Sequence, residues 1–150
     1  MAKCASFGRL ISSINQNLSI YIDAKLYEDK IGAGQIAFLT ALQNEDGVNQ
    51  EALTTKLGVD KATTARAVAK LVKEGYVTRK RDETDNRAYK LHLTHKGHEI
   101  KPKIKNVLQG LTEILSAGLT QQERATVMLL LEKMYLNILA ENKKQKKATL

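Results

Sequence analysis

Apolar residues at the start of the chain recur with the period of an α-helix. Between residues 7 and 26 they occupy the i, i+3, i+4 and i+7 positions that form one helical face. These residues are Phe7, Leu10, Ile11, Ile14, Leu18, Tyr21, Ile22 and Leu26. The pattern predicts an amphipathic helix of about five turns. Gly32 and Gly34 interrupt it, and the spacing of Ile36, Leu39 and Leu42 predicts a second, shorter helix.

Two short helices joined by a tight turn are predicted in the middle of the chain. Asn49 is a good N-cap for a helix over Gln50–Leu57, and Gly58 lies where a helix-ending glycine is expected. Asp60 is in turn a good N-cap for a helix over residues 61–74. Because so few residues separate them, the two helices are predicted to form a helix-turn-helix unit.

The second helix of this unit has two contrasting faces. Its inner face is predicted to contain Thr64, Ala67, Val68 and Leu71. Its outer face combines cations with small side chains, namely Lys61, Ala62, Ala65, Arg66, Ala69 and Lys70. A helix that is cationic and also slim can enter a DNA major groove, which is about 12 Å wide.

A β-hairpin is predicted directly after this helix. Gly75 ends the helix, and residues 76–81 and 89–93 alternate in polarity as strands do. The segment between them, residues 82–88, is rich in Asp, Asn and Arg, which suits a turn. The predicted fold is therefore mainly α with a small β-hairpin wing, a winged helix-turn-helix between N- and C-terminal helices.

Two long helices are predicted after the hairpin. Thr94 can cap the first, and Pro102 should bend or loosen its opening turns before Gly118 ends it. A capping box at residues 120–123 opens the other, whose cationic end at residues 143–147 is expected to fray.

The first, fifth and sixth predicted helices carry more apolar surface than the helix-turn-helix and its hairpin can cover. Burying these faces against a second copy is the economical solution, so a homodimer through these three helices is expected. We expect residues 1–150 to form a single domain. Within it, residues of about 1–30 and 98–147 would provide dimerisation helices, and about 33–97 the DNA-binding region.

The charge of the chain favours a polyanionic partner. The net charge is +8 and the pI is about 9.6. From Lys61 to Arg81 there are seven cations and a single acid, Glu74, so the charge is concentrated on the predicted helix and hairpin. Double-stranded DNA is the favoured partner, although an evenly solvated basic surface would give the same total.

Other features of the sequence bound the location of the protein. Cys4 is the single cysteine, so the chain cannot form an internal disulfide. Apolar runs fall well short of the roughly 18 residues that a membrane helix needs. A cytoplasmic protein without a membrane partner is expected.

Taken together, these segments resemble the MarR family of transcriptional regulators. The resemblance is carried by GVNQEAL at 47–53, LGVDKATTAR at 57–66, residues 71–81 with Gly75, Asp85-x-Arg87, and Leu91-x-Leu93-Thr94-x-x-Gly97. It implies a homodimer whose recognition helices, residues 61–74, enter successive major grooves of a pseudo-palindromic operator. It also implies that Arg87 enters the minor groove and that Asp85 orients the cations around it. Thr64 and Ala67, smaller or more polar than the residues often found there, are expected to loosen the packing of the recognition helix.

The candidate DNA contacts have different expected roles. Arg66 and Lys61 could contact base edges or phosphates, and Thr63 could donate to a phosphate or merely cap its helix. Lys70, Arg79 and Arg81 are expected to add affinity that does not depend on sequence. The full predicted set is Lys61, Ala62, Thr63, Ala65, Arg66, Lys70, Arg79, Arg81, Asp85 and Arg87.

Three further groups of residues have weaker functional interpretations. His92, His95 and His98 could bind a metal or simply lie on the surface, and no cysteine is near them in sequence. Cys4 could be a redox-sensitive thiol or an unreactive terminal cysteine. Arg9, a cation among apolar neighbours, is the candidate partner for an anionic ligand. No metal or other cofactor is expected, and the resemblance allows a phenolic or aromatic acid as effector.

The predicted function is that of a ligand-responsive, sequence-specific DNA-binding regulator, acting as a repressor. The chain lacks a nucleophile elbow and a phosphate-binding glycine loop, so an enzyme is not expected. The alternatives are a general or architectural protein of double-stranded DNA without ligand control, and a winged helix that binds other proteins. The general DNA-binding protein would use the same cations, whereas the concentrated charge disfavours the protein-binding module.

Overall fold

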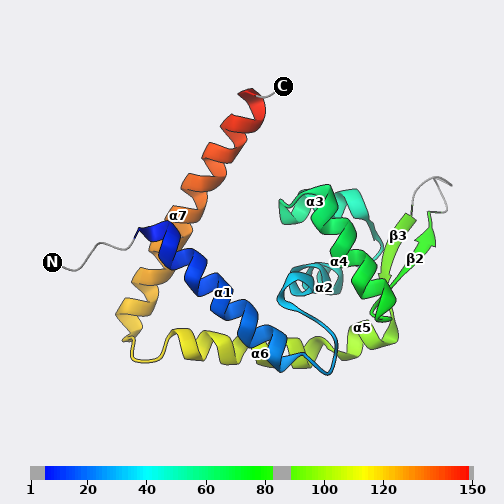
Figure 1. The fold of residues 1–150 in the computed structure, drawn as a ribbon, viewed down its shortest axis with the longest axis horizontal. Helices are drawn as coiled ribbons and strands as arrows, with labels where there is room; N and C mark the ends of the chain where they lie inside the picture. The colour runs from blue at the N-terminus through cyan, green and yellow to red at the C-terminus, as the bar shows by residue number, and fades with distance from the viewer. Residues whose placement is uncertain (1–5, 83–88, 149–150) are drawn as a thin grey trace. The chain divides into compact units, whose positions relative to one another are not determined.

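The computed structural model describes residues 6–82 and 89–148, with side chains described as far as residue 145. The chain divides into two compact units, Met1–Leu111 and Thr112–Leu150. The elements follow in the order α1 (Phe7–Lys25), α2 (Ala33–Asn44), β1 (Val48–Asn49), α3 (Gln50–Leu57), α4 (Lys61–Lys73), β2 (Val77–Arg81), β3 (Tyr89–Leu93), α5 (His95–Glu99), α6 (Lys101–Leu115) and α7 (Gln121–Ala148) (Figure 1). The predicted fold class is confirmed.

Helix α2 begins earlier than its apolar spacing predicted. Gly34 lies inside the helix rather than before it, and Gly32 is the N-cap. The Gly32 amide donates to Gln35 Oε1 at 2.9 Å, and the Ala33 amide donates to Asp23 Oδ1 at 2.7 Å. A carboxylate on the preceding helix therefore satisfies an amide at the start of α2, which its own sequence does not show.

The helix-turn-helix unit forms as predicted, because each boundary has a local cause. Asn49 Oδ1 accepts from the Ala52 amide at 2.7 Å and so caps α3. Gly58 ends α3 in the left-handed conformation, with φ of 65°, which a residue with a Cβ adopts at a cost. Asp60 then caps α4, and the structure ends that helix at Lys73, one residue before the predicted end.

In the described part of the chain, three strands form an antiparallel sheet in the order β1-β3-β2. The β2–β3 hairpin has the predicted strands, with Val77 opposite Leu93 and Arg81 opposite Tyr89. Strand β1 was not predicted, because it has two residues and forms only through the pairing of Val48 with Leu91 and of Asn49 with Lys90. The hairpin is thereby attached to the segment that leads into α3.

Asp46 joins this sheet to the turn before it. Its Oδ1 accepts from the Leu93 amide at 2.8 Å, and its Oδ2 lies 3.1 Å from His92 Nδ1. Partial burial acts to raise the pKa of Asp46, but the Leu93 amide and His92 outweigh it. The pKa therefore lies below its usual value of 3.8.

Replacing Asp46 by Ala is expected to destabilise the protein by about 1 kcal/mol at neutral pH. The Leu93 amide loses its acceptor, and the loss is moderated because the Asp46 side chain is 41% exposed and water can replace it in part. Since the folded-state pKa is lowered, this stabilisation is present above the unfolded value of 3.8 and disappears as the pH falls through the folded value. Urea unfolding at several pH values measures it.

Glu45→Ala is the matched control for that experiment. Glu45 is the neighbouring acid and forms an exposed ion pair with Lys56 at 2.7 Å. Such pairs contribute little, so the change should stay within about 0.5 kcal/mol. Equal losses in both variants would show that Asp46 has no special role.

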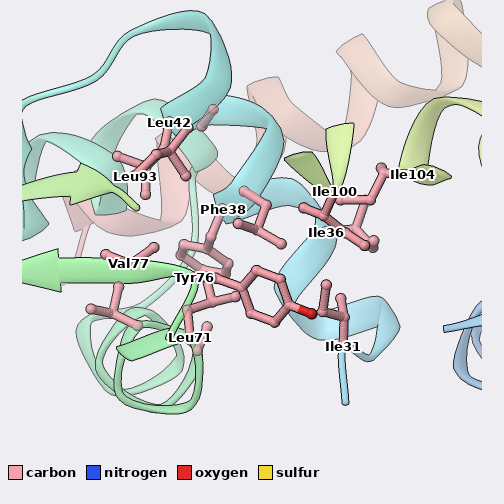
Figure 2. Close-up of a cluster of buried hydrophobic side chains, with 14 of the residues drawn as sticks. Ile31, Ile36, Phe38, Leu42, Leu71, Tyr76, Val77, Leu93, Ile100 and Ile104 are labelled. Atoms are coloured by element: carbon pink, nitrogen blue, oxygen red, sulfur yellow. The ribbon is translucent and has the colours of Figure 1, made fainter. Parts of the chain in front are cut away.

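The core of the first unit is centred on Tyr76. Its side chain is 1% exposed and its hydroxyl donates to the Asp29 carbonyl at 2.9 Å. Figure 2 shows its ring between the aliphatic side chains of the cluster and reaching toward Ile31. Lys96 Nζ lies 4.2 Å from the ring centroid, a cation–π contact that covers the outer side. This core draws α1, α2, α4, the sheet and the start of α6 into one body.

The predicted fifth helix is divided into α5 and α6. Thr94 caps α5 as expected, its hydroxyl accepting from the Gly97 amide at 3.1 Å. The division falls at Ile100, two residues before Pro102, whose nitrogen has no proton to continue the helical bonds. Ile100 itself keeps helical dihedrals, and its amide donates to the Lys96 carbonyl at 3.2 Å. The predicted disturbance at Pro102 is therefore an interruption of one residue.

In the second unit, the capping box is confirmed. The Thr120 amide donates to Glu123 Oε2 at 2.8 Å, and the Glu123 amide donates back to Thr120 Oγ1 at 3.3 Å. The bonds from the Thr120 amide and hydroxyl hold the pKa of Glu123 below its usual range. Helix α7 continues to Ala148 and so includes the cationic residues 143–147, whose fraying stays a prediction. None of the helices within the described residues could span a membrane.

Candidate nucleic-acid interface

Helix α4 separates into the two faces that its sequence predicted. Its buried residues are Thr64, Ala67, Val68 and Leu71. Thr64 is fully buried, and its hydroxyl accepts from Thr54 Oγ1 at 2.9 Å and donates to the Asp60 carbonyl at 3.2 Å. The polar atom that distinguishes Thr64 from an aliphatic residue is therefore satisfied inside the interface of α3 and α4.

At the start of α4, hydrogen bonds link three side chains on its outward face. Asp60 Oδ1 accepts from the Thr63 amide at 2.8 Å, and Asp60 Oδ2 accepts from Thr63 Oγ1 at 2.6 Å. Arg66 Nη2 in turn donates to Thr63 Oγ1 at 3.1 Å. The Thr63 hydroxyl and amide hold the pKa of Asp60 below its usual value. The carboxylate is thus ionised and directed toward its own helix.

Two further cations of this surface contact the first turn of α3. Lys61 Nζ lies 3.5 Å from Glu51 Oε1, with both side chains well exposed. Arg79 Nη2, on β2, donates to Gln50 Oε1 at 3.5 Å. Helix α3, helix α4 and the sheet pack against one another (Figure 1), and the start of α3 contacts a cation from α4 and another from β2.

The wing strands carry the remaining cations. Arg79, Lys80 and Arg81 are exposed on β2, and Lys90 on β3 forms an ion pair of 3.3 Å with Asp82. Asp85 and Arg87, the predicted wing contacts, lie outside the described residues. Ala62 is exposed and Ala65 is half-buried. Their methyl side chains add little bulk to the outward face of α4 between its cations.

Lys70 lies apart from the other candidates. It lines an open pocket of about 490 Å³ between the end of α1, the loop after it and the end of α4. The pocket also contains residues of both charges, namely Asp23, Glu28, Lys30 and Glu74. Lys70 therefore faces mixed charges and does not join the bonded group around Arg66. Arg9, the candidate ligand residue, is exposed on α1 and is not among the residues that line this pocket.

The three histidines have different surroundings. His92 pairs with Asp46, and His95 Nε2 lies 3.0 Å from Glu99 Oε1 on the same helix. His98 is exposed. Among the described residues, no group of three His, Cys, Asp or Glu side chains is placed to hold a metal ion. Cys4 lies outside those residues.

Sequence reasoning missed the side chains that contact these cations. Gln50 and Glu51 were assigned only to the start of a helix, and Asp60 only to a cap. The three-residue spacings of Asp60, Thr63 and Arg66 could have revealed their bonds, because side chains at i and i+3 are neighbours on a helix. The contact of Gln50 with Arg79 joins residues 29 positions apart and had no local signal.

Comparisons with known proteins agree with this arrangement. The model of the MarR family matches residues 31–89. The uncharacterized HTH-type transcriptional regulator YybA of Bacillus subtilis is 32% identical over 105 residues, which make up 70% of each chain. A crystal structure of a MarR transcriptional regulator from Methanosarcina mazei Go1 is 44% identical with a TM-score of 0.80, over 89% of this chain and 96% of that one.

A second solved structure includes a ligand. The crystal structure of a putative MarR family transcriptional regulator from Listeria monocytogenes, complexed with a 26mer DNA, is 25% identical with a TM-score of 0.80. The likeness covers 91% of both chains. A likeness of this extent reaches beyond the helix-turn-helix into the outer helices.

Proposed function

The chain belongs to the MarR family of transcriptional regulators, and from that premise we propose that it is a sequence-specific regulator that binds a pseudo-palindromic operator as a homodimer. The observation that carries the proposal is the exposed cationic face shared by α4 and β2. The DNA in the complex of the Listeria monocytogenes relative supports a duplex as the ligand.

Helix α4 is proposed as the element that enters the major groove. Its outward side chains at Ala62 and Ala65 are small, so the helix backbone can approach the base edges closely. Arg66 carries donors that can bind guanine O6 and N7 together, and Lys61 supplies a charge for a base edge or a nearby phosphate. Thr63 has its hydroxyl proton engaged with Asp60, which favours its capping role over donation to phosphate.

The wing strands are proposed to bind the DNA backbone. Arg79 and Arg81 are exposed on β2 and would each neutralise a phosphate, which adds affinity that falls with salt. The family resemblance assigns the minor-groove contact to Arg87 and its orientation to Asp85. Lys70 would reach phosphate only from the side of α4 that faces the mixed-charge pocket, so it is the weakest member of the proposed set.

The proposed homodimer would bury apolar side chains that the single chain leaves exposed. On α1 these are Phe7, Leu10, Ile11, Ile14 and Ile20, and Phe7 is 74% exposed. On α6 and α7 they are Ile114, Leu115, Val127, Met128, Leu129, Leu130, Leu131, Tyr135, Leu136 and Ile138. Patches of this extent mark an interface in a water-soluble protein. The helices are those predicted to dimerise, with α6 and α7 in place of the fifth and sixth.

Repression and release by a small aromatic acid complete the proposal. A dimer seated on its operator excludes other proteins from that DNA, which makes repression the expected direction. Release is supported by the family resemblance, and Arg9 is the proposed partner for the acid because it is an exposed cation on an apolar helix. Within the single domain proposed for residues 1–150, residues 33–97 would read the operator and the outer helices would dimerise.

Competition between a selected operator and random duplex tests this function with the full chain. The expected ratio of affinities is at least about 10³, as for other sequence-specific binders. A ratio near one would instead establish the general or architectural protein, and no binding would favour the protein-interaction module. Adding salicylate-type acids to the same assay should release the operator complex, and unchanged binding at millimolar acid would remove the effector from the proposal.

A further inference from the structure

We propose that Thr63 is a positioning residue whose hydroxyl links the Arg66 guanidinium to the Asp60 carboxylate, so that Arg66 meets the operator in one orientation. This inference rests on the proposed function, because it concerns how Arg66 recognises DNA. It assigns Thr63 a task different from contact with phosphate and from capping alone.

The hydrogen bonds around Thr63 have a definite direction. A threonine hydroxyl has one proton, and Thr63 Oγ1 gives it to Asp60 Oδ2 at 2.6 Å. The oxygen then accepts from Arg66 Nη2 at 3.1 Å. A cation therefore donates to the hydroxyl, and the hydroxyl donates to an anion. Bonds with an ionised partner are about twice as strong as those between neutral groups.

Because the Thr63 hydroxyl donates its proton to Asp60, it cannot also donate to a DNA phosphate in this arrangement. Phosphate oxygens are acceptors, and the Thr63 hydroxyl has no second proton to offer them. The hydrogen bonds from Arg66 through Thr63 to Asp60 also explain how an acidic side chain can lie on the proposed DNA-binding surface. Its two oxygens both accept bonds from Thr63, so its charge is directed into the helix and toward Arg66.

Arg66 keeps the capacity to read a base while it is held. The guanidinium has five N–H bonds, of which the contact with Thr63 uses one. The remaining donors suffice for the paired contact with guanine O6 and N7. Restricting a flexible side chain before binding removes an entropy cost that corresponds to about 2- to 12-fold in affinity.

Holding Arg66 in one orientation should raise the affinity for the operator more than the affinity for random duplex. The paired contact with guanine requires a fixed plane and direction, whereas a phosphate can be met by an arginine in many rotamers. Loss of the Thr63 hydroxyl is therefore expected to weaken operator binding more than binding to random duplex. A purely structural role would weaken both together.

A double-mutant cycle on the full chain tests the proposal with the selected operator and random duplex. Thr63→Val keeps the branched shape and the hydrogen bond from the backbone N–H of residue 63 to Asp60 Oδ1, but it removes the hydroxyl. It should weaken operator binding about 5- to 10-fold and random binding less than about 2-fold. In an Arg66→Ala background the same change should have almost no further effect, because its target is gone.

Thr63→Ser is the matched control, since it restores the hydroxyl and should bind the operator as the parent protein does. Thermal unfolding of each variant checks folding, and Thr63→Ala takes the place of Thr63→Val if the valine variant does not fold. An equal loss with and without Arg66 would overturn the positioning role while leaving the regulator intact. A parent protein without operator preference would overturn both the proposed function and this inference.

Discussion

Replacing Gly97 by Ala is expected to destabilise the protein by about 3 kcal/mol or more, the upper end of the range for overpacking a core. A Cβ at this buried position would lie 2.3 Å from the Tyr76 carbonyl oxygen and 2.9 Å from Leu93 Cδ2. The first contact is with backbone and cannot be relieved by a side-chain rotation. Helix α5 would have to move away from the turn that joins α4 to β2.

Four bonds oppose that movement. The Tyr76 carbonyl accepts from the Thr94 amide at 3.0 Å, and the Thr94 hydroxyl donates to the Gly75 carbonyl at 2.6 Å. Lys96 Nζ donates to the Glu74 carbonyl at 2.8 Å. The Gly97 carbonyl itself accepts from Gln43 Nε2 at 3.2 Å. Relief of the clash would break several of these together.

Urea unfolding at one fixed protein concentration measures the effect, since a dimer makes stability depend on concentration. Gly34→Ala is the matched control, because a Cβ there has no neighbour within 4 Å among the described atoms and Gly34 lies in helix α2. That control should be neutral or stabilise by up to about 1 kcal/mol through helix propensity. If Gly97→Ala unfolds at the urea concentration of the parent, α5 is free to shift and the close approach has no energetic importance.

Replacing Leu131 by Glu is expected to convert the proposed dimer into monomers. Leu131 lies at the centre of a helical stripe on α7 formed by Val127, Leu131, Met134, Tyr135 and Ile138. It is 48% exposed in the single chain, so the monomer should tolerate the charge. A carboxylate buried without a partner between two copies should raise the dimer dissociation constant at least about 100-fold.

Sedimentation or light scattering over a range of concentrations measures the mass relative to the 16.7 kDa chain. Asn137→Glu is the matched control, because it adds the same charge on the polar side of α7 and should leave the dimer intact. Circular dichroism confirms that both variants keep their helices. A dimer that survives Leu131→Glu would place the interface away from this stripe.

Loss of the dimer has a direct consequence for DNA binding. Two linked heads bind two half-sites about 10 bp apart, and the second contact is made at high effective concentration. A monomer would retain the exposed face of α4 and β2 but bind one half-site, so operator affinity should fall by about 10²-fold or more. Affinity for random duplex should fall less.

Local chemistry explains why so much of the helix-turn-helix and the hairpin could be predicted. Asn49 and Asp60 cap helices through bonds that span three residues, and Gly58 ends a helix through its own backbone freedom. The buried face of α4 follows from helical period alone. For the same reason the two strands of the hairpin and the capping box of α7 were predicted nearly to the residue.

Elements that depend on distant partners were not predictable. Strand β1 exists because Val48 meets Leu91, and α2 starts at Ala33 because Asp23 on another helix accepts its amide proton. Gln50 holds Arg79 across 29 positions. The surroundings of Lys70 also depend on the end of α1 and the loop after it, which bring mixed charges beside it.

The sequence by itself determined the helix-turn-helix, the hairpin, the cationic outer face of α4 and the presence of apolar helices around them. Each of these follows from period, capping and turn residues, which act over a few positions. The tertiary structure alone decided that Arg79 contacts Gln50 and that Gly97 lies against the Tyr76 carbonyl. These contacts depend on how separate elements pack, which short-range patterns do not encode. The bond from Arg66 to Thr63 is local, and the structure added only the rotamers that form it.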